Sequence, residues 1–326
     1  DLKAYVANLT RNIVLESENP ATHHRGHVMF MHSDDVHVAN VAFNDLGRTD
    51  KSIALDDRIV VADRSQPNGF RADPAPLHDI DNPRGRYAVH VHRAGDTIDG
   101  SPAVVEGSVV WGSPGWGFVA HDSYADFKDN VAFDVFGGHF VAETGNETGT
   151  WSGNLAVKGE GRKAERPIVY DTVVHDFGFE GNGFWLNGRL VEVLDNVAAG
   201  MRGFGFNWFA RGGGQIDVDP GNLDHPATAG YKHHVPAWVP ALDDVIGNEA
   251  FASGTAIRII RKGFTQGHDE RSHIKDFVGW EVVQGVYLTY STNYLFEDVP
   301  LIATKTANGT LGFLFNTNVE NVTLRK

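Results

Sequence analysis

Short hydrophobic runs, rather than long amphipathic stretches, set the pattern of this chain. Each run holds a few β-branched or aromatic residues, opens with Asn, Asp or Gly, and commonly closes with glycine. Such runs between turn residues are typical of β-strands, and the 37 glycines leave few windows long enough for three helical turns. The chain is therefore predicted to be all-β. The runs lie at residues 40–47, 107–112, 130–137, 154–157, 171–174, 196–200, 248–251, 276–279 and 321–324.

The spacing of these runs repeats along the chain. The runs that open at Gly107, Asn130 and Asn154 follow one another at nearly equal intervals. Three short strands in a repeat of about 21–25 residues are what one coil of a parallel β-helix requires. We therefore predict a right-handed, single-stranded parallel β-helix, a solenoid like that of pectate lyases, with the leading Asn or Asp residues stacked at one corner. The alternative is an antiparallel β-sandwich, which would place strand signals about every 8–12 residues without a long period.

Longer intervals between runs are expected to hold loops that project from the stack. The clearest of these covers about residues 212–240, which contain three consecutive glycines and several prolines. No linker divides the sequence, so residues 1–326 are expected to form one elongated domain.

Several histidines share one phase of the predicted strands. Side chains alternate between the two faces of a strand, so residues two apart lie on the same face. If the hydrophobic residues between them point into the coil, five polar side chains point outward together: His90, His92, His121, His139 and Glu143. Four imidazoles and a carboxylate form a candidate site for a divalent metal, with zinc or another transition metal favoured and calcium also open. Without a metal, one of these histidines would act as a general base.

Other basic and aromatic residues accompany this histidine strip. His27 extends the strip if its strand stacks beneath the His90 coil, Arg86 is suited to neutralise a carboxylate, and Tyr87 could transfer a proton at a sugar carbon. These three residues are the catalytic candidates. Further arginines and tryptophans are candidates for substrate binding, because guanidinium groups bind carboxylates and indole faces stack on sugar rings. They are Arg84, Arg93, Trp116, Trp185, Arg202 and Trp208.

Composition removes several classes of function. The chain carries 28 basic and 42 acidic side chains, a net charge of −14, which opposes binding to nucleic acid. It has no cysteine and no apolar run long enough to insert into a membrane. It begins at Asp1 without a methionine, which suggests a trimmed mature protein or an excised domain.

The histidine motifs resemble those of a known family. Gly85-Arg-Tyr-Ala-Val-His-Val-His92 resembles the Gly-Arg-Tyr-Pro-Ile-His-Phe-His stretch of the family of cell-surface hyaluronidase and cell-migration-inducing hyaluronan-binding protein. Residues 25–32, 118–121 and 138–145 are similar to other segments of that family. Its members join a G8 domain to parallel β-helix repeats, and the resemblance covers about residues 8 to 160. Residues 1–326 are expected to hold the repeats without a G8 domain, and Ala88 and Val89 replace the family's proline and isoleucine.

The resemblance implies an enzyme that degrades an acidic, uronic-acid or glycosaminoglycan-like polysaccharide with help from a divalent cation. It also implies a secreted, periplasmic or cell-surface protein, here expected to be bacterial, from which an N-terminal module such as G8 could be missing. Elimination, as in a polysaccharide lyase, and hydrolysis, as in a glycoside hydrolase, both stay open. The alternatives are a non-catalytic carbohydrate-binding module or adhesin, and a uronate epimerase.

Overall fold

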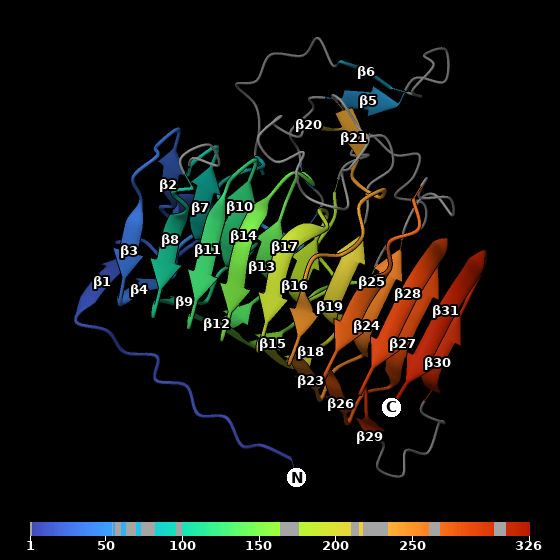
Figure 1. Cartoon of the computed structure of the whole chain (residues 1–326). Helices are drawn as coiled ribbons and strands as arrows, with labels where there is room; N and C mark the ends of the chain where they lie inside the picture. The colour runs from blue at the N-terminus through green and yellow to red at the C-terminus, as the bar shows by residue number, and fades with distance from the viewer. Residues whose placement is uncertain are drawn as a thin grey trace.

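Three long parallel sheets build the molecule, and they wind around one common axis (Figure 1). The computed structural model describes residues 2–53, 55, 60–62, 70–72, 82–95, 100–163, 176–209, 215–217, 234–260, 268–302 and 311–326. Each sheet has nine strands, and the only helix among the described residues is a 3-10 turn at Thr22–His24. The predicted right-handed parallel β-helix is therefore confirmed.

Each coil contributes one strand to every sheet. Sheet A contains β1 (Ile13–Glu16), β4 (Val41–Asn44), β9 (Val109–Trp111), β12 (Val131–Val135), β15 (Leu155–Gly159), β18 (Val197–Met201), β23 (Glu249–Phe251), β26 (Val278–Trp280) and β29 (Leu301–Ile302). Sheet B contains β2 (Val28–Met31), β7 (Val89–His92), β10 (Phe118–His121), β13 (Gly138–Ala142), β16 (Asn182–Leu186), β19 (Phe204–Phe209), β24 (Thr255–Ile260), β27 (Gln284–Thr289) and β30 (Leu311–Phe315). Sheet C contains β3 (His37–Ala39), β8 (Ala103–Glu106), β11 (Ala125–Lys128), β14 (Thr148–Ser152), β17 (Leu190–Leu194), β22 (Val245–Ile246), β25 (Ser272–Lys275), β28 (Ser291–Glu297) and β31 (Val319–Arg325).

The predicted coil period appears directly in the strand register. In sheet A, Val109 pairs with Val131, which in turn pairs with Leu155. Each pairing joins positions one coil apart, and both separations fall within the range expected from the sequence. The predicted strand at 171–174 lies outside the described residues.

Stacked asparagines occupy one corner of the coil, as the sequence predicted. The Asn130 side-chain amide donates to Asn154 Oδ1 at 3.1 Å, and Asn154 donates to Asn196 Oδ1 at 2.9 Å. Asn196 continues the ladder to Asn248 at 3.1 Å, and all four residues are fully buried. Each amide also donates to a backbone carbonyl of the preceding coil, such as Val105 for Asn130. The ladder thus satisfies buried polar groups that would otherwise be costly at the chain's turns.

The interior of the coil is a stack of identical or similar side chains. Phe118, Phe140, Phe184 and Phe206 lie on consecutive strands of sheet B, with ring centroids 4.7–5.1 Å apart and nearly parallel planes. On sheet A a column of alanines in the same core occupies successive strands, formed by Ala132, Ala156, Ala198 and Ala250. Burial of each phenyl ring contributes about 1.5–3 kcal/mol, so the aromatic column stabilises the coil stacking on which the rest depends.

Loops project where the sequence predicted long intervals. Within the predicted loop 212–240, β20 (Gln215–Asp217) pairs antiparallel with β21 (His234–Pro236), and most of the remaining loop lies outside the described residues. A second antiparallel pair joins β5 (Val60–Ala62) to β6 (Phe70–Ala72), and both hairpins project from the upper edge of the stack in Figure 1. Among the described residues, no helix has the length and apolar character needed to cross a membrane.

Candidate functional site

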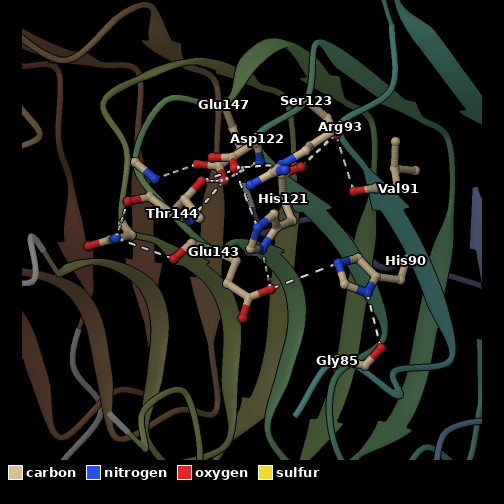
Figure 2. Close-up of polar contacts among 12 residues, drawn as sticks. Gly85, His90, Val91, Arg93, His121, Asp122, Ser123, Glu143, Thr144 and Glu147 are labelled. Carbon is tan, nitrogen blue, oxygen red and sulfur yellow. Dashed lines mark hydrogen bonds and ion pairs between the residues drawn. The ribbon is translucent and has the colours of Figure 1, made fainter. Parts of the chain in front are cut away.

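Three histidines and one glutamate meet on the outward face of sheet B. In the register of β7 and β10, His92 pairs with His121, and His90 lies two positions earlier on the same face. Ala120 pairs with Ala142 of β13, so Glu143 takes the next position beside His121. Figure 2 shows the Glu143 carboxylate between the rings of His90 and His121. The parallel register therefore brings these residues together from three consecutive coils. We call His90, His92, His121 and Glu143 the His–Glu cluster.

The distances within the His–Glu cluster are short. Glu143 Oε2 lies 3.0 Å from His121 Nδ1 and 3.8 Å from His90 Nε2. The rings of His92 and His121 stack with centroids 4.4 Å apart, and the ring of His90 meets both edge-on. One nitrogen from each histidine lies within 4.8 Å of the other two. The three imidazoles therefore converge on one small volume.

Two ring nitrogens in the His–Glu cluster are buried and have no hydrogen-bond partner among the described residues. They are His90 Nε2 and His92 Nδ1. His90 Nδ1 lies 3.1 Å from the carbonyl oxygen of Gly85, so Nδ1 carries the proton and Nε2 presents a lone pair. A backbone acceptor that fixes the tautomer in this way is common behind metal-binding histidines. Buried polar atoms without a partner are rare, and two of them in a group of three converging histidines fit a bound cation.

The protonation states favour a metal-binding set. Burial lowers the pKa of His90, and burial together with the neighbouring His121 lowers the pKa of His92 to about 4. Burial alone would raise the pKa of Glu143, but the hydrogen bond and charge of His121 outweigh it and lower that pKa to about 2. Burial by itself would lower the pKa of His121. The hydrogen bond and the negative charge of Glu143 outweigh burial, so the pKa of His121 is raised. The cluster thus combines two histidines whose neutral forms are favoured with a carboxylate that is held ionised beside His121.

The donor set suits some metals better than others. Three imidazole nitrogens and one carboxylate oxygen match zinc and other first-row transition metals. Calcium prefers about six to eight oxygen ligands, which these residues do not supply. His90, His92, His121 and Glu143 are therefore the residues that would hold a metal.

His139 does not belong to the cluster, and its predicted outward position is wrong. Its ring is fully buried, and both ring nitrogens lie near backbone carbonyls, Asn182 O at 2.9 Å and Val157 O at 3.1 Å. A Cβ added to the preceding Gly138 would meet Val141 Cγ2 at 2.5 Å, so Gly138 faces outward with Val141. The simple alternation therefore breaks at the start of β13, and His139 turns into the corner between sheets A and B.

The predicted tryptophan surfaces are also wrong. Trp116 and Trp185 are 0% and 1% exposed, and Phe177 packs against both rings. Trp208 is 2% exposed and belongs to the interior of the coil, packed against Phe206. Burial leaves none of the three indole faces open to a sugar ring, because a loop covers the first two and the coil encloses the third.

Tyr87 lies at the boundary between this covered aromatic group and the His–Glu cluster. Its ring stacks on Trp116 at 4.3 Å and is 5.3 Å from the ring of His90. The residue is fully buried, and its hydroxyl has no hydrogen-bond partner in the described part of the chain. Burial raises the pKa of Tyr87 well above its usual value, with a further contribution from the charge of Glu143. Tyr87 therefore stays protonated and could donate a hydrogen bond or a proton.

The predicted arginines are distributed around the cluster. Arg84 lies over the ring of Phe177 at 5.5 Å, and its charge helps to lower the pKa of Glu143. Arg86 is half-buried, and its charge acts on both His27 and His90. Arg93 is exposed and forms an ion pair with Asp122 at 3.3 Å. Arg202 lies outside the cluster, on the turn after β18, where it donates to Gly161 O at 2.7 Å.

Lys51 is a buried charge that the sequence did not reveal. Its ammonium donates to Asp176 Oδ1 at 2.9 Å and to Phe177 O at 3.0 Å, and lies 4.3 Å from the centre of the Trp116 ring. Arg162 binds the other oxygen of Asp176 at 2.6 Å. Complete burial lowers the pKa of Lys51 to about 8, although Asp176 opposes this shift. These contacts hold in place the loop that covers Trp116. No sequence pattern indicated them, because Lys51 and Asp176 belong to loops that are far apart in the chain.

Comparison with known proteins agrees with the motif resemblance. Residues 81–212 match a protein-family model described as CEMIP beta-helix. Among solved structures, the chain is similar to the catalytic unit of a thermostable GH87 alpha-1,3-glucanase from Streptomyces thermodiastaticus strain HF3-3, with 12% identity and a TM-score of 0.22. This match covers 71% of the present chain and 54% of the glucanase chain, so the chain spans about half of that length. A TM-score this low supports no inference about fold or function. No curated protein matches the chain.

The matched segment contains the whole His–Glu cluster, together with Arg84, Arg86 and Tyr87. The resemblance inferred from residues 85–92 is thereby confirmed over this segment. Residues 81–212, less than half of the chain, are similar to the CEMIP beta-helix family.

Proposed function

We propose that this protein is a metal-assisted enzyme that degrades an acidic polysaccharide on the outward face of sheet B. The observation that carries the proposal is the convergence of His90, His92 and His121 beside Glu143. Two buried ring nitrogens of this group, His90 Nε2 and His92 Nδ1, lack a hydrogen-bond partner among the described residues. The metal would be held by these four residues and would supply a positive charge that stabilises a developing anion. The CEMIP match supports the proposal, because the resemblance inferred from the sequence implies a glycosaminoglycan-like substrate.

The side chains around the cluster favour elimination over hydrolysis. Glycoside hydrolysis ordinarily uses two carboxylates that flank the scissile bond. The cluster itself contains one carboxylate, Glu143; a second, Asp122, lies 3.5 Å from His121 Nε2 but is also paired with Arg93. Elimination instead requires a neutral base, a proton donor and a positive charge near the uronate carboxylate. His27 and Arg86 would supply the base and the positive charge, whereas the predicted donor Tyr87 is fully buried, which leaves proton donation to water.

The roles of these three residues follow from their surroundings. Burial and the charges of Arg86 and Arg48 lower the pKa of His27 to about 4, so its imidazole is neutral at neutral pH and can accept the C5 proton. Tyr87 remains protonated, but its ring is fully buried beside His90, so water rather than Tyr87 would protonate the leaving oxygen. Arg86 would pair with the uronate carboxylate and so acidify the C5 proton. A carboxylate placed beside Arg86 would also offset the charge that lowers the pKa of His27, which makes the base stronger when substrate is bound.

The test combines metal content with two product assays. Purified protein is analysed for bound metals, then incubated with hyaluronan, unsulfated chondroitin, alginate and pectate. We expect reducing ends to rise together with the ultraviolet absorbance of an unsaturated uronate. Glu143→Gln and His90→Ala should abolish both signals, whereas His37→Ala, which changes an exposed histidine on sheet C, should preserve them.

Other outcomes would replace parts of the proposal. Reducing ends without the absorbance change would show hydrolysis. Binding without either signal would support a carbohydrate-binding module or adhesin, and altered uronate stereochemistry in the product's NMR spectrum would support an epimerase. Full turnover by metal-free protein would refute the role of a metal.

A further inference from the structure

A second group of basic side chains lies beside the His–Glu cluster, at the corner between sheets A and B. It consists of His27, directly before β2, Arg48, after β4, and Arg86, before β7. Backbone hydrogen bonds hold the three segments together. Arg48 N donates to Arg86 O at 2.8 Å, and Gly47 N donates to Gly26 O at 2.8 Å. Three residues from separate parts of the chain are thus neighbours in space.

The positive charges of this group act on one another. Burial contributes most to lowering the pKa of His27, and the charges of Arg86 and Arg48 follow as the next largest causes. The geometric reason is the set of backbone hydrogen bonds given above, which hold both arginines beside the segment that carries His27. The charge of Arg86 also reaches His90, which places the group next to the proposed metal ligands.

The two arginines of this group differ from other arginines nearby in their lack of a counter-ion among the described residues. Arg25 pairs with Asp45 at 3.2 Å, and Arg93 pairs with Asp122 at 3.3 Å. In the part of the chain that the structure describes, neither Arg48 nor Arg86 has a carboxylate within ion-pair distance, and both are only partly exposed. Partly desolvated like charges without a partner are unfavourable, and a bound anion would relieve the repulsion.

We propose that His27, Arg48 and Arg86 form an anion subsite that binds one carboxylate or sulfate group of an acidic polysaccharide. Two guanidinium groups can hold such a group by paired, charge-assisted hydrogen bonds, and a neutral His27 can add a third donor. The inference rests on the proposed function for its polysaccharide ligand, and it adds Arg48 as a determinant of specificity. The subsite also resolves how a chain of net charge −14 attracts a polyanion, because positive charge is concentrated where the substrate binds.

The test measures binding rather than turnover, in the presence of EDTA and at low ionic strength. Calorimetry compares hyaluronan oligosaccharides, the same oligosaccharides with their carboxyl groups reduced to alcohols, and sulfated chondroitin oligosaccharides. Arg48→Gln and Arg86→Gln are expected to weaken the binding of the charged ligands about ten- to a hundredfold. Arg48→Lys keeps the charge and should restore part of the lost affinity.

The matched control is Arg271→Gln, which removes the same charge from an exposed site. Arg271 donates to the side chains of Thr323 and Asn321, near the last strand of sheet C. Thermal unfolding checks that each variant is folded. Because Arg48 forms no ion pair with any described residue and its charge repels that of Arg86, its replacement should leave the unfolding temperature unchanged or raise it.

Each result has a defined meaning for the subsite. Loss of affinity for hyaluronan but not for its carboxyl-reduced form assigns the site to a carboxylate, and loss confined to the sulfated ligand assigns it to a sulfate. Equal binding by wild type, Arg48→Gln and Arg271→Gln, or no binding of any ligand by wild type, overturns the inference. Arg48-dependent binding without turnover would refute the enzyme but keep the subsite, whereas turnover with Arg48-independent binding would refute the subsite alone.

Discussion

Removal of one proposed metal ligand should separate metal binding from folding, and His92 is the best ligand to remove. Its Nδ1 has no partner among the described residues, and its side chain is partly exposed, so His92→Ala breaks no hydrogen bond of that atom. The metal-free variant should therefore unfold at nearly the same temperature as metal-free wild type. Only the wild type should be stabilised when zinc is added, because the variant lacks one of the three converging nitrogens.

The size of this stabilisation can be worked out. A ligand that binds only the folded state contributes about 2.7 kcal/mol at a concentration one hundred times its Kd. The unfolding entropy of a 326-residue chain is about 0.7 kcal/mol per kelvin at roughly 2.1 cal/mol/K per residue. The two values together give an increase of about 4 °C in the unfolding temperature of wild type.

Differential scanning calorimetry of EDTA-treated protein, with and without added zinc, manganese or calcium, measures this shift. The double variant His23→Ala/His24→Ala is the control for adventitious zinc, because these adjacent rings lie 4.2 Å apart in the turn before β2. It should keep the full shift. A zinc shift of equal size in wild type and His92→Ala, or a larger shift with calcium than with zinc, would refute the assignment of the ligands.

Three further predictions concern stability in urea. Lys51→Met removes one of the two cations that pair with the buried Asp176 and should lower the free energy of unfolding by about 3 kcal/mol. A loss below about 1 kcal/mol would contradict this prediction. Tyr5→Phe removes the hydroxyl that donates to the buried Glu249 and should lower the free energy of unfolding by about 1 kcal/mol. Val6→Ala, at a 95% exposed site, should leave that free energy unchanged, and equal effects of the two variants would disprove the contact. The pKa of His27 is about 4 when the chain is folded and 6.5 when it is unfolded, so the unfolded chain binds the proton first and wild type should lose stability as the pH falls from 6.5 to 4. His27→Gln should reduce this loss by ~1 kcal/mol after allowance for solvent screening. Parallel pH profiles of wild type and His27→Gln would argue against a neutral His27.

Much of the fold was predictable because its causes are local and repeated. The alternation of side chains and the nearly constant number of residues per coil can both be read from the sequence. The register of β9, β12 and β15 could therefore be predicted from the spacing of the hydrophobic runs. The same count placed His121 beside Glu143, and alternation placed His90 and His92 on one face. The part of the site that lies on regular strands was therefore predictable.

The misplaced residues lie where regular geometry ends. His139 stands at the entrance to β13, where one residue breaks the alternation and two backbone carbonyls capture the imidazole. Trp116 and Trp185 do face outward from the strands, but a loop from a distant part of the chain covers them. Strand periodicity carries no information about what a loop will cover.

By itself, the sequence determined the coil, its period and the shared phase of three histidines, because a regular strand fixes the direction of each side chain from its position. The tertiary structure alone decided which charges are paired. It brought Lys51 to Asp176, 125 residues away, and it placed Arg48 beside Arg86 with no counter-ion among the described residues. Such pairings depend on how loops from separate coils pack at a corner, and packing over that distance is a property of the folded chain rather than of any local pattern.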